Sequence, residues 1–468
     1  EVRFDSLYRY DLADKLALQE HEIAVSNGVS KAVPVLDSIY ISAPKPYKKA
    51  AHMFNIHSWT PVYVNVDNIM NMSFDKIYQA AYVLKDVVRE TALIPSPKIN
   101  PKSEVYLKTE NLQLTGSFKV RGSAYKIAML SEEEKARGVI ACSAGNHAQG
   151  VALAASKCGI SSLICLPENA PLSKVEATKG FGADVCLVPG VYDDAYKKAL
   201  ELKEEHGYTF VHPFDDENVI AGQGTIGLEI LNEMDDLDAV IVPIGGGGLI
   251  AGIAFAIKSL RPNVKVYGVQ AAGAPSMFRS IKDGQIGTLD SVSTIADGIA
   301  VKRPGDLTYE IVSKYVDDIA TVTEDEICAA ILKLIEKQKM IAEGAGAVSV
   351  AAAMFNKFPI QGKKVVCVIS GGNIDVTSLS RVINRGLMKS GRTATLQIEL
   401  MDKPGMLKDV THIIADCGGN VTGVYHDRGR SENINECILR IDLETRNYAH
   451  IEEILSALRQ AGIKVTLD

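Results

Sequence analysis

The pattern of hydrophobic and polar positions divides the chain into three segments. In the long middle segment, short runs rich in β-branched residues alternate with helical stretches, and the runs cover residues 104–108, 138–142, 162–166, 184–188, 239–243, 264–269 and 365–369. Apolar runs joined by helices are typical of parallel sheets covered on both faces. Ligands bind beyond the carboxyl ends of the strands in such folds, and the glycine- and asparagine-rich clusters of this chain follow these runs.

The segment before it has a different pattern. Residues 1–72 contain two short strand-like runs, 38–42 and 61–66, and no catalytic spacing, so we interpret them as an extension of unknown role, such as a gene-fusion remnant. An amphipathic helix over 74–84 with Ser73 as its N-cap should open the middle segment. We therefore expect deletion of residues 1–71 to leave the activity intact.

From about residue 393 the alternation of apolar and polar residues predicts a separate small unit. Its expected elements are strand, helix, strand, strand, helix and strand at residues 395–400, 406–417, 420–425, 436–441, 450–461 and 463–467. This βαββαβ order is that of a ferredoxin-like α+β unit. The predicted organisation is an extension (1–72), an α/β domain (73–390) and a small C-terminal domain (393–468).

Composition narrows the class of partner. The 468 residues, 47% hydrophobic and 23% charged, suit a globular protein of two or three domains. The net charge of -7 argues against nucleic acid or an anionic membrane as the main partner, and no run approaches the ~20 apolar residues of a membrane span. The eight cysteines form no CxxC pair and no zinc-ligand spacing, so we expect free thiols, a cytoplasmic location and no metal site.

The most informative motif is Thr115-Gly116-Ser117-Phe118-Lys119-Val120-Arg121-Gly122. It places Lys119 between two apolar residues at the start of a predicted helix, with the Ser117 hydroxyl as a candidate N-cap. An amine held against apolar neighbours at a positive helix terminus loses its proton more readily, and a Schiff base with an aldehyde cofactor requires a neutral amine. By itself, a structural lysine explains the motif equally well.

Two further clusters follow predicted strands and open helices. In Ser143-Ala144-Gly145-Asn146-His147 the backbone amides would point at an anion. Asn146 either caps the helix or donates to a ring oxygen, and we expect His147 to be a packing histidine. The second cluster is the run Gly245-Gly246-Gly247-Gly248-Leu249. Four consecutive glycines lose much conformational entropy on folding, so their presence needs a reason. Close approach of the backbone to a single phosphate provides that reason. A dinucleotide site is disfavoured because Gln270, and no acidic residue, ends the next strand.

The last cluster, Ser370-Gly371-Gly372-Asn373, again follows a strand. A turn explains its glycines. Ser370 adds a neutral hydroxyl that can hydrogen-bond to a ring nitrogen without requiring that nitrogen to be protonated. An amine, a phosphate-binding loop, an asparagine and a serine together describe a site for pyridoxal 5′-phosphate.

These motifs, in this order, resemble those of the fold type II pyridoxal-phosphate enzymes, most closely the threonine ammonia-lyases (threonine dehydratases). The resemblance covers residues 73–390 and includes His212-Pro213-Phe214-Asp215-Asp216. It implies a tryptophan-synthase-β-like fold with two doubly wound sheet subdomains.

The resemblance also assigns roles to residues. It implies that Lys119 carries the internal aldimine with pyridoxal phosphate, that Asn146 bonds the pyridine 3′ oxygen and that Ser370 meets the ring nitrogen. The remaining implied contacts are Phe118 along the ring, Gly245, Gly246, Gly247, Gly248 and Leu249 at the phosphate, and Ser143, Ala144, Gly145 and Asn146 at the substrate carboxylate.

The implied reaction is β-elimination of L-threonine to 2-oxobutanoate and ammonia, with Lys119 as the base that removes the Cα proton. A neutral partner at the ring nitrogen favours elimination over transamination. L-serine should react too, because one methyl group in an apolar pocket is worth only about 1–3 kcal/mol. The resemblance further suggests a homodimer or homotetramer that serves isoleucine biosynthesis or threonine breakdown.

The C-terminal segment resembles the ACT domains, small regulatory modules that bind amino acids. Its Asp402-Lys403-Pro404-Gly405 turn, after the first expected strand, matches their ligand motif. We expect an amino-acid effector, isoleucine or valine, to bind between paired ACT domains near Asp402, Gly405 and Asn420 and to regulate the enzyme allosterically.

Three alternatives stay open. Serine racemase or serine dehydratase is the closest within the family, although the segment after residue 269 lacks the acidic pair expected of the racemase's metal ligands. Cysteine synthase is less favoured, because its substrate loop has a different sequence. A non-catalytic amino-acid sensor is disfavoured by the retention of Lys119, Asn146, Ser370 and all four loop glycines.

Overall fold

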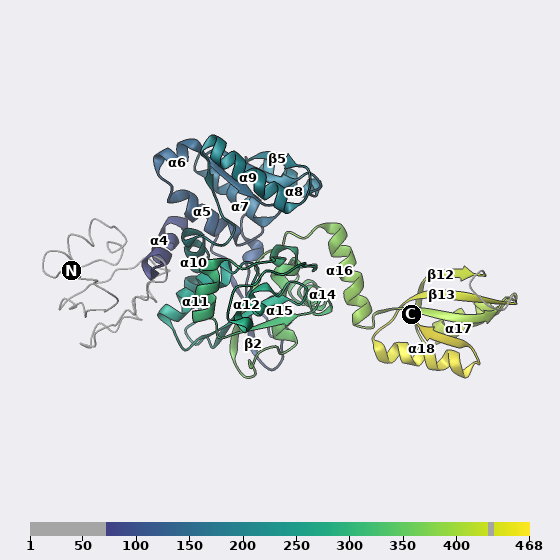
Figure 1. Cartoon of the computed structure of the whole chain (residues 1–468). Helices are drawn as coiled ribbons and strands as arrows, with labels where there is room; N and C mark the ends of the chain where they lie inside the picture. Colours follow the sequence, from purple (N-terminus) through teal and green to yellow (C-terminus); the bar gives the residue numbers. More distant parts are fainter. Residues whose placement is uncertain (1–71, 429–434) are drawn as a thin grey trace, which may run out of the picture. The chain divides into compact units, whose positions relative to one another are not determined.

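The computed structural model describes residues 72–428 and 435–468. They form two units: the first takes in the described chain up to Glu324 together with Ile341–Asn373, and the second takes in Asp325–Met340 and the described part of Ile374–Asp468. Figure 1 labels several elements of each unit. The strand-like runs expected at 38–42 and 61–66 lie outside the described residues.

The first unit contains two sheets. The larger has the order β1-β2-β10-β7-β8-β9, with strands β1 (Leu93–Pro95), β2 (Glu104–Lys108), β7 (Ala239–Pro243), β8 (Lys265–Ala271), β9 (Asp318–Val322) and β10 (Lys364–Val368). Within this sheet only the β1–β2 pair is antiparallel. Every residue of β7 is buried, as a run of apolar residues without a polar face predicts.

The smaller sheet is wholly parallel and has the order β5-β4-β3-β6. Its strands are β3 (Val139–Cys142), β4 (Ser162–Pro167), β5 (Asp184–Val188) and β6 (Thr209–Phe210). All seven apolar runs predicted for the middle segment are strands, with ends shifted by two residues at most, so the prediction of largely parallel sheets is confirmed. The pattern misses β1 and β6, which are very short, and β9, which mixes polar with apolar residues.

Helices connect the strands of the first unit. They are α4 (Phe74–Leu84), α5 (Lys119–Ala128), α6 (Glu132–Arg137), α7 (Asn146–Lys157), α8 (Leu172–Gly180), α9 (Tyr192–His206), α10 (Glu217–Glu233), α11 (Gly248–Leu260), α12 (Ser276–Asp283), α13 (Asp306–Tyr315) and α15 (Gly344–Met354). Helix α4 has the predicted bounds and Ser73 at its N-cap position, but the Ser73 side chain makes no capping bond. Among the described residues, no helix combines the length and apolar character that crossing a membrane requires.

Helix α10 packs against α5 and α11 with direct contact between backbones. A Cβ atom on Gly222 of α10 would lie 2.7 Å from the Cα atom of Gly122 in α5, and one on Gly252 of α11 would lie 2.3 Å from a carbonyl oxygen of α10. These crossings therefore require glycine. Because α5 begins at Lys119 and α11 begins at Gly248, α10 sets the separation of the two helices that carry the main sequence motifs.

A buried ion network joins α5 and α10. The fully buried Arg121 side chain of α5 pairs with Glu110, in the 3-10 turn Glu110–Leu112, at 2.8 Å and with Glu229 of α10 at 2.5 Å. Lys108 is also fully buried and pairs with Glu229 at 2.8 Å and with Glu233 at 3.0 Å. Each buried charge would be costly without its partners, so this network holds the two helices in one relative position.

The second unit contains a four-stranded antiparallel sheet with the order β12-β13-β11-β14. Its elements are β11 (Thr393–Met401), α17 (Met406–Asp416), β12 (Asn420–Asp427), β13 (Glu436–Glu444), α18 (Tyr448–Gln460) and β14 (Lys464–Leu467). Both helices bury apolar residues against the sheet, and the predicted βαββαβ order is confirmed. Most of α14 (Glu324–Lys333) and the helix α16 (Val376–Lys389) also belong to this unit.

Replacing Gly222 with alanine should lower the free energy of unfolding of the first unit by about 1–3 kcal/mol, because the added methyl group would press α10 away from α5. Urea denaturation of the variant and the parent protein measures the difference. The matched control is Gly180→Ala in α8, where an added Cβ would meet no atom within 4 Å and the unfolded chain loses flexibility. Equal stability of the two variants would contradict the close contact.

Candidate active site

The segment that carries Lys119 is attached to the loop that carries Ser370. Helix α5 begins at Lys119, as predicted, with Phe118 at its N-cap position and no side-chain cap. The N–H of Phe118 donates to the carbonyl oxygen of Ser370 at 3.1 Å, and Ser117 pairs with Gly371 in an isolated β-bridge. The expectation that Ser117 caps the helix is wrong, because its hydroxyl is buried and bonds to no group in the described residues.

The amine of Lys119 points at the backbone of another loop. Its Nζ donates to the carbonyl oxygen of Pro213 at 2.6 Å and lies 5.3 Å from the centre of the Phe118 ring. Burial lowers the pKa of Lys119 to about 8, against the opposing attraction of Glu343. The prediction that this lysine gives up its proton readily is supported, and the cause is burial among protein atoms.

The 212–216 motif is the turn that presents the Pro213 carbonyl. The Nδ1 atom of His212 accepts the N–H of Asp215 at 2.7 Å, so the ring is a neutral acceptor at this atom, and burial lowers the pKa of His212. The Asp215 carboxylate in turn accepts the N–H groups of Asp306 and Thr308, at 3.0 and 3.1 Å. These two hydrogen bonds attach the 212–216 turn to the start of α13.

The tetraglycine run is packed tightly from one side. A Cβ on Gly246 would lie 2.5 Å from the Phe214 ring, and one on Gly247 would lie 2.7 Å from Thr308. The Thr308 hydroxyl donates to the Gly246 carbonyl oxygen at 2.6 Å. Helix α11 starts at Gly248, with Gly247 as a left-handed N-cap (φ 104°) and no side-chain cap. The first N–H groups of this helix therefore keep their hydrogen-bonding capacity for an anion.

The Ser370 side chain is buried beside α15. It is 3% exposed, and its Oγ donates to the carbonyl oxygen of Ala345 at 3.3 Å. A bond of this length is weak. The hydroxyl is thus a neutral group that can turn toward a better acceptor.

Asn146 is held on both sides of its amide. It is the first residue of α7, with Gly145 at the N-cap position and no side-chain cap, so the capping alternative is not what the structure shows. Its Nδ2 donates to the Oε1 of Glu343 at 2.7 Å, and its Oδ1 accepts from the Nδ2 of Asn373 at 2.8 Å. Asn373 also donates to the Thr115 carbonyl oxygen at 2.7 Å, which ties Asn146 to the Lys119 segment.

Glu343 is the site residue that the sequence analysis missed. It is 5% exposed and directly precedes α15, and burial raises its pKa to about 7. The available signal was one carboxylate immediately before a helix whose residues 344–353 are all buried. An acidic residue just before an apolar helix is also typical of an ordinary N-cap. Only the contact of Glu343 with Asn146, which is distant in sequence, distinguishes a site residue from a helix cap.

The loop 143–145 is open, and His147 is a packing residue. The Ser143 hydroxyl accepts the N–H of Gly145 at 3.1 Å, and a Cβ on Gly145 would meet no atom within 4 Å. Ala144 is only partly buried. His147 lies 2.8 Å from the Val211 carbonyl oxygen, and burial lowers its pKa to about 3. It is therefore neutral, as expected of a histidine in the core.

Comparison with known proteins identifies the family of the chain. The model of the family described as "Pyridoxal-phosphate dependent enzyme" matches residues 84–371, and the model of the ACT domain matches residues 389–462. The chain belongs to the pyridoxal-phosphate dependent enzymes. The fold class inferred from the motifs, with its C-terminal ACT domain, is thereby confirmed.

The relatives of this pyridoxal-phosphate enzyme are named for different activities. The L-threonine ammonia-lyase of Thermotoga maritima is 51% identical over 399 residues, which are 85% of this chain and 99% of that protein. Threonine deaminase isoform 2 from Solanum lycopersicum, in its processed form, has a TM-score of 0.63 at 38% identity over 66% of this chain and 93% of that one. Maize serine racemase has a TM-score of 0.64 at 34% identity, and the match covers 68% of this chain and 98% of that one. The shared fold therefore accommodates more than one reaction.

The observed groups suit pyridoxal phosphate. An aldehyde requires a partly neutral amine, and Lys119, with its pKa of about 8, provides one. A phosphate requires N–H donors, and the uncapped first turn of α11 provides them together with the positive end of the helix dipole. A pyridine nitrogen requires a neutral donor when it is unprotonated, and the Ser370 hydroxyl is suitable.

The residues expected to bind an effector are placed in the ACT domain but are not all free. The Asp402 carboxylate pairs with the Nε of Arg428 at 2.8 Å, and the Asn420 amide donates to Glu444 at 2.8 Å. Gly405 ends the 402–405 turn as the N-cap residue of α17, with φ 97°, and a Cβ there would meet nothing within 4 Å. An effector near Gly405 would thus have to share or displace these side-chain pairs.

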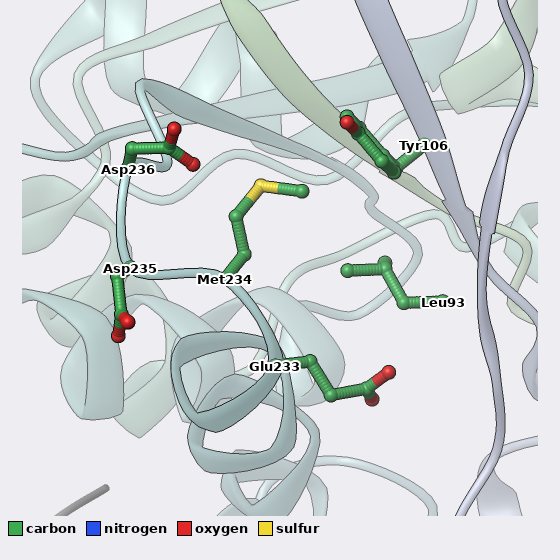
Figure 2. A pocket seen from close by; sticks show the side chains of 6 residues that line it. All are labelled: Leu93, Tyr106, Glu233, Met234, Asp235 and Asp236. Atoms are coloured by element: carbon green, nitrogen blue, oxygen red, sulfur yellow. The ribbon is translucent and has the colours of Figure 1, made fainter.

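A separate hollow of about 460 Å³ is lined by Leu93, Tyr106, Glu233, Met234, Asp235 and Asp236, and Figure 2 shows these six side chains. It lies at the carboxyl end of α10, beside β1 and β2, and contains none of the predicted site residues. Its acidic side chains are paired with cations: Glu233 with Lys108, Asp235 with Arg261, and Asp236 with Lys364. We assign it no part in the chemistry.

Uptake of pyridoxal phosphate by the apoenzyme should follow the titration of Lys119. Only the neutral amine attacks an aldehyde, so the incorporation rate should rise about tenfold per pH unit at low pH and level off above about pH 8. Stopped-flow absorbance after mixing cofactor with apoenzyme measures this incorporation rate. The Lys119→Ala variant should show no covalent uptake of the cofactor. A rate that keeps rising to about pH 10 would mean an ordinary lysine pKa.

Proposed function

We propose that this pyridoxal-phosphate enzyme is a threonine ammonia-lyase, which converts L-threonine to 2-oxobutanoate and ammonia and accepts L-serine as a second substrate. The observation that carries the proposal is the buried amine of Lys119, whose pKa is lowered by burial to about 8 and which lies on a segment bonded directly to the Ser370 loop. The 51% identity to an L-threonine ammonia-lyase, along 99% of that protein, supports this choice of reaction.

The proposal assigns the groups at the site the following tasks. Pyridoxal phosphate, when bound, supplies a conjugated system that accepts electrons from the substrate Cα. Lys119 would anchor the cofactor through its amine, and the same amine, when free and neutral, would remove the Cα proton of the substrate as general base. Asn146 would donate to the 3′ oxygen of the ring, Ser370 would donate to the ring nitrogen, and Phe118 would flank the ring. The first backbone N–H groups of α11 and of the loop before it would hold the phosphate, at Gly245, Gly246, Gly247, Gly248 and Leu249.

The loop Ser143-Ala144-Gly145-Asn146 receives the substrate carboxylate. Support comes from its position at the N-terminus of α7, where amides favour an anion, and from the open space beside Gly145. L-serine differs from L-threonine by one methyl group, which limits discrimination to about 1–3 kcal/mol. Both amino acids should therefore react at this loop.

The remaining parts of the chain have supporting tasks. We infer an extension at 1–72, a catalytic domain at 73–390 and a regulatory ACT domain at 393–468 that binds isoleucine or valine near Asp402, Gly405 and Asn420. We also infer a homodimer or homotetramer in the cytoplasm. All eight cysteines are free thiols, which supports a reducing compartment.

The Lys119→Ala variant tests the reaction. Loss of the anchor and of the base should lower the rate of 2-oxobutanoate release from L-threonine by roughly 10³-fold or more. The matched control is Lys282→Ala, on the exposed side of α12, which should keep the parent rate. Chiral analysis of the same mixtures with L-serine separates the alternatives: accumulation of D-serine without oxo acid from either substrate would mean a racemase.

Branched-chain amino acids test the regulatory part. Isoleucine or valine should shift the substrate dependence of oxo-acid release, because an ACT domain acts through differential binding of its effector. Asn420→Ala should weaken this response at unchanged basal activity, whereas Glu452→Ala, on the exposed face of α18, should not. A parent enzyme indifferent to both amino acids would rule them out as effectors.

A further inference from the structure

The carboxyl group of Glu343 is buried at the proposed reaction centre and has no task in the reaction described above. It occupies the N-cap position of α15 in an extended backbone conformation, yet it makes no capping bond to its own helix. A Cβ on Gly371 would lie 2.3 Å from its Oε1, and one on Gly298 would lie 3.5 Å from it. Backbone therefore confines this carboxyl on two sides, and a buried carboxyl requires a partner.

That partner is Asn146, and a chain of acceptors determines which way its amide faces. The Thr115 carbonyl oxygen can only accept, so Asn373 must present its NH₂ group there, at 2.7 Å. The same NH₂ group donates to the Oδ1 of Asn146 at 2.8 Å. Asn146 thus presents its own NH₂ group to Glu343, at 2.7 Å. One of its two N–H groups is used by Glu343, and the other remains for a further acceptor.

We propose that Glu343 is a positioning residue for the cofactor: it holds one N–H of Asn146 so that the other is directed at the 3′ oxygen of pyridoxal phosphate, and its negative charge stabilises the cofactor bound at Lys119. The inference deepens the proposed function and rests on it for the contact between Asn146 and the cofactor.

The charged groups around Glu343 come from three elements. Lys119 of α5 and Lys174 of α8 attract the ionised carboxylate, whereas Asp297, in the 3-10 turn Asp297–Ile299, repels it. Lys174 and Asp297 also pair with each other at 2.9 Å, and the repulsion from Asp297 affects Glu343 more than the attraction from Lys174 does. Burial is the largest influence and raises the pKa of Glu343 to about 7. The carboxyl is therefore mostly neutral at pH 6 and mostly ionised above pH 8.

Two substitutions separate the charge of Glu343 from its hydrogen bond. Glu343→Gln keeps an oxygen that accepts from Asn146 but cannot ionise, so it imitates the protonated carboxyl. Glu343→Ala removes both properties. The readout is the dissociation constant of pyridoxal phosphate, measured by absorbance titration of apoenzyme at several pH values between about 6 and 9. Glu310→Gln, on the exposed face of α13, is the matched control for a lost surface charge.

The glutamine variant should bind the cofactor like the parent protein near pH 6 and about tenfold more weakly near pH 8.5, because an opposite charge near a cation is worth about one pKa unit or more. The alanine variant should bind more weakly at every pH, and the control should match the parent protein throughout.

Three outcomes would overturn the inference. The first is a glutamine variant with the parent affinity at every pH, and the second is an alanine variant with unchanged affinity. The third is an equal loss in both variants at all pH values with a lowered thermal midpoint, which would indicate a purely structural role. Failure of the proposed reaction is distinguishable, because a parent protein that shows this pH dependence but releases no oxo acid from L-threonine would leave the role of Glu343 intact.

Discussion

The contact of α10 with α5 and α11, backbone against backbone, is the constraint on which the site depends. Gly122, Gly222 and Gly252 remove the side chains that would otherwise keep these helices apart. Because α5 begins at Lys119 and α11 begins at the end of the tetraglycine run, the crossings determine how far the amine lies from the phosphate-type donors. Close-packed interiors resist compression, so this separation is a property of the fold and does not depend on flexible side chains. The ion pair between Arg121 of α5 and Glu229 of α10 opposes a shift of one helix along the other.

Burial then decides the chemistry of the groups that the helices bring together. It lowers the pKa of Lys119 to about 8 and raises that of Glu343 to about 7, so both groups exchange protons near neutral pH. Burial also keeps His147 and His212 neutral. Pairs of titratable groups shifted toward neutrality are typical of catalytic centres. Backbone amides, an asparagine amide and a serine hydroxyl surround them, which are neutral groups that suit a cofactor carrying its own charges.

Local sequence predicted most of the strands and the motifs at their ends, but it missed β1, β6 and β9. Each predicted apolar run of the middle segment is a strand because a stretch with no polar face has to be buried on both sides. The helix at Lys119 starts where expected, since the glycine at position 116, with φ 70°, permits the preceding turn. The capping details were less predictable. Ser73 stands at its N-cap without bonding, and Ser117 is not a cap at all, because hydroxyl orientation depends on neighbours from other segments.

By itself, the sequence determined the parallel sheets, the ACT-type unit, the lysine at a helix start and the glycine run, because each depends on residues close together in the chain. Only the tertiary structure decided that Asn146 binds Glu343, which is 197 residues away, and Asn373, which is 227 residues away. Neither contact has a local signal, since the acidic residue before α15 reads as a cap and the asparagine reads as part of a turn. Folding brings the partly buried Asn146 to the buried Glu343, because a buried carboxyl requires a hydrogen-bond partner and its own helix supplies none.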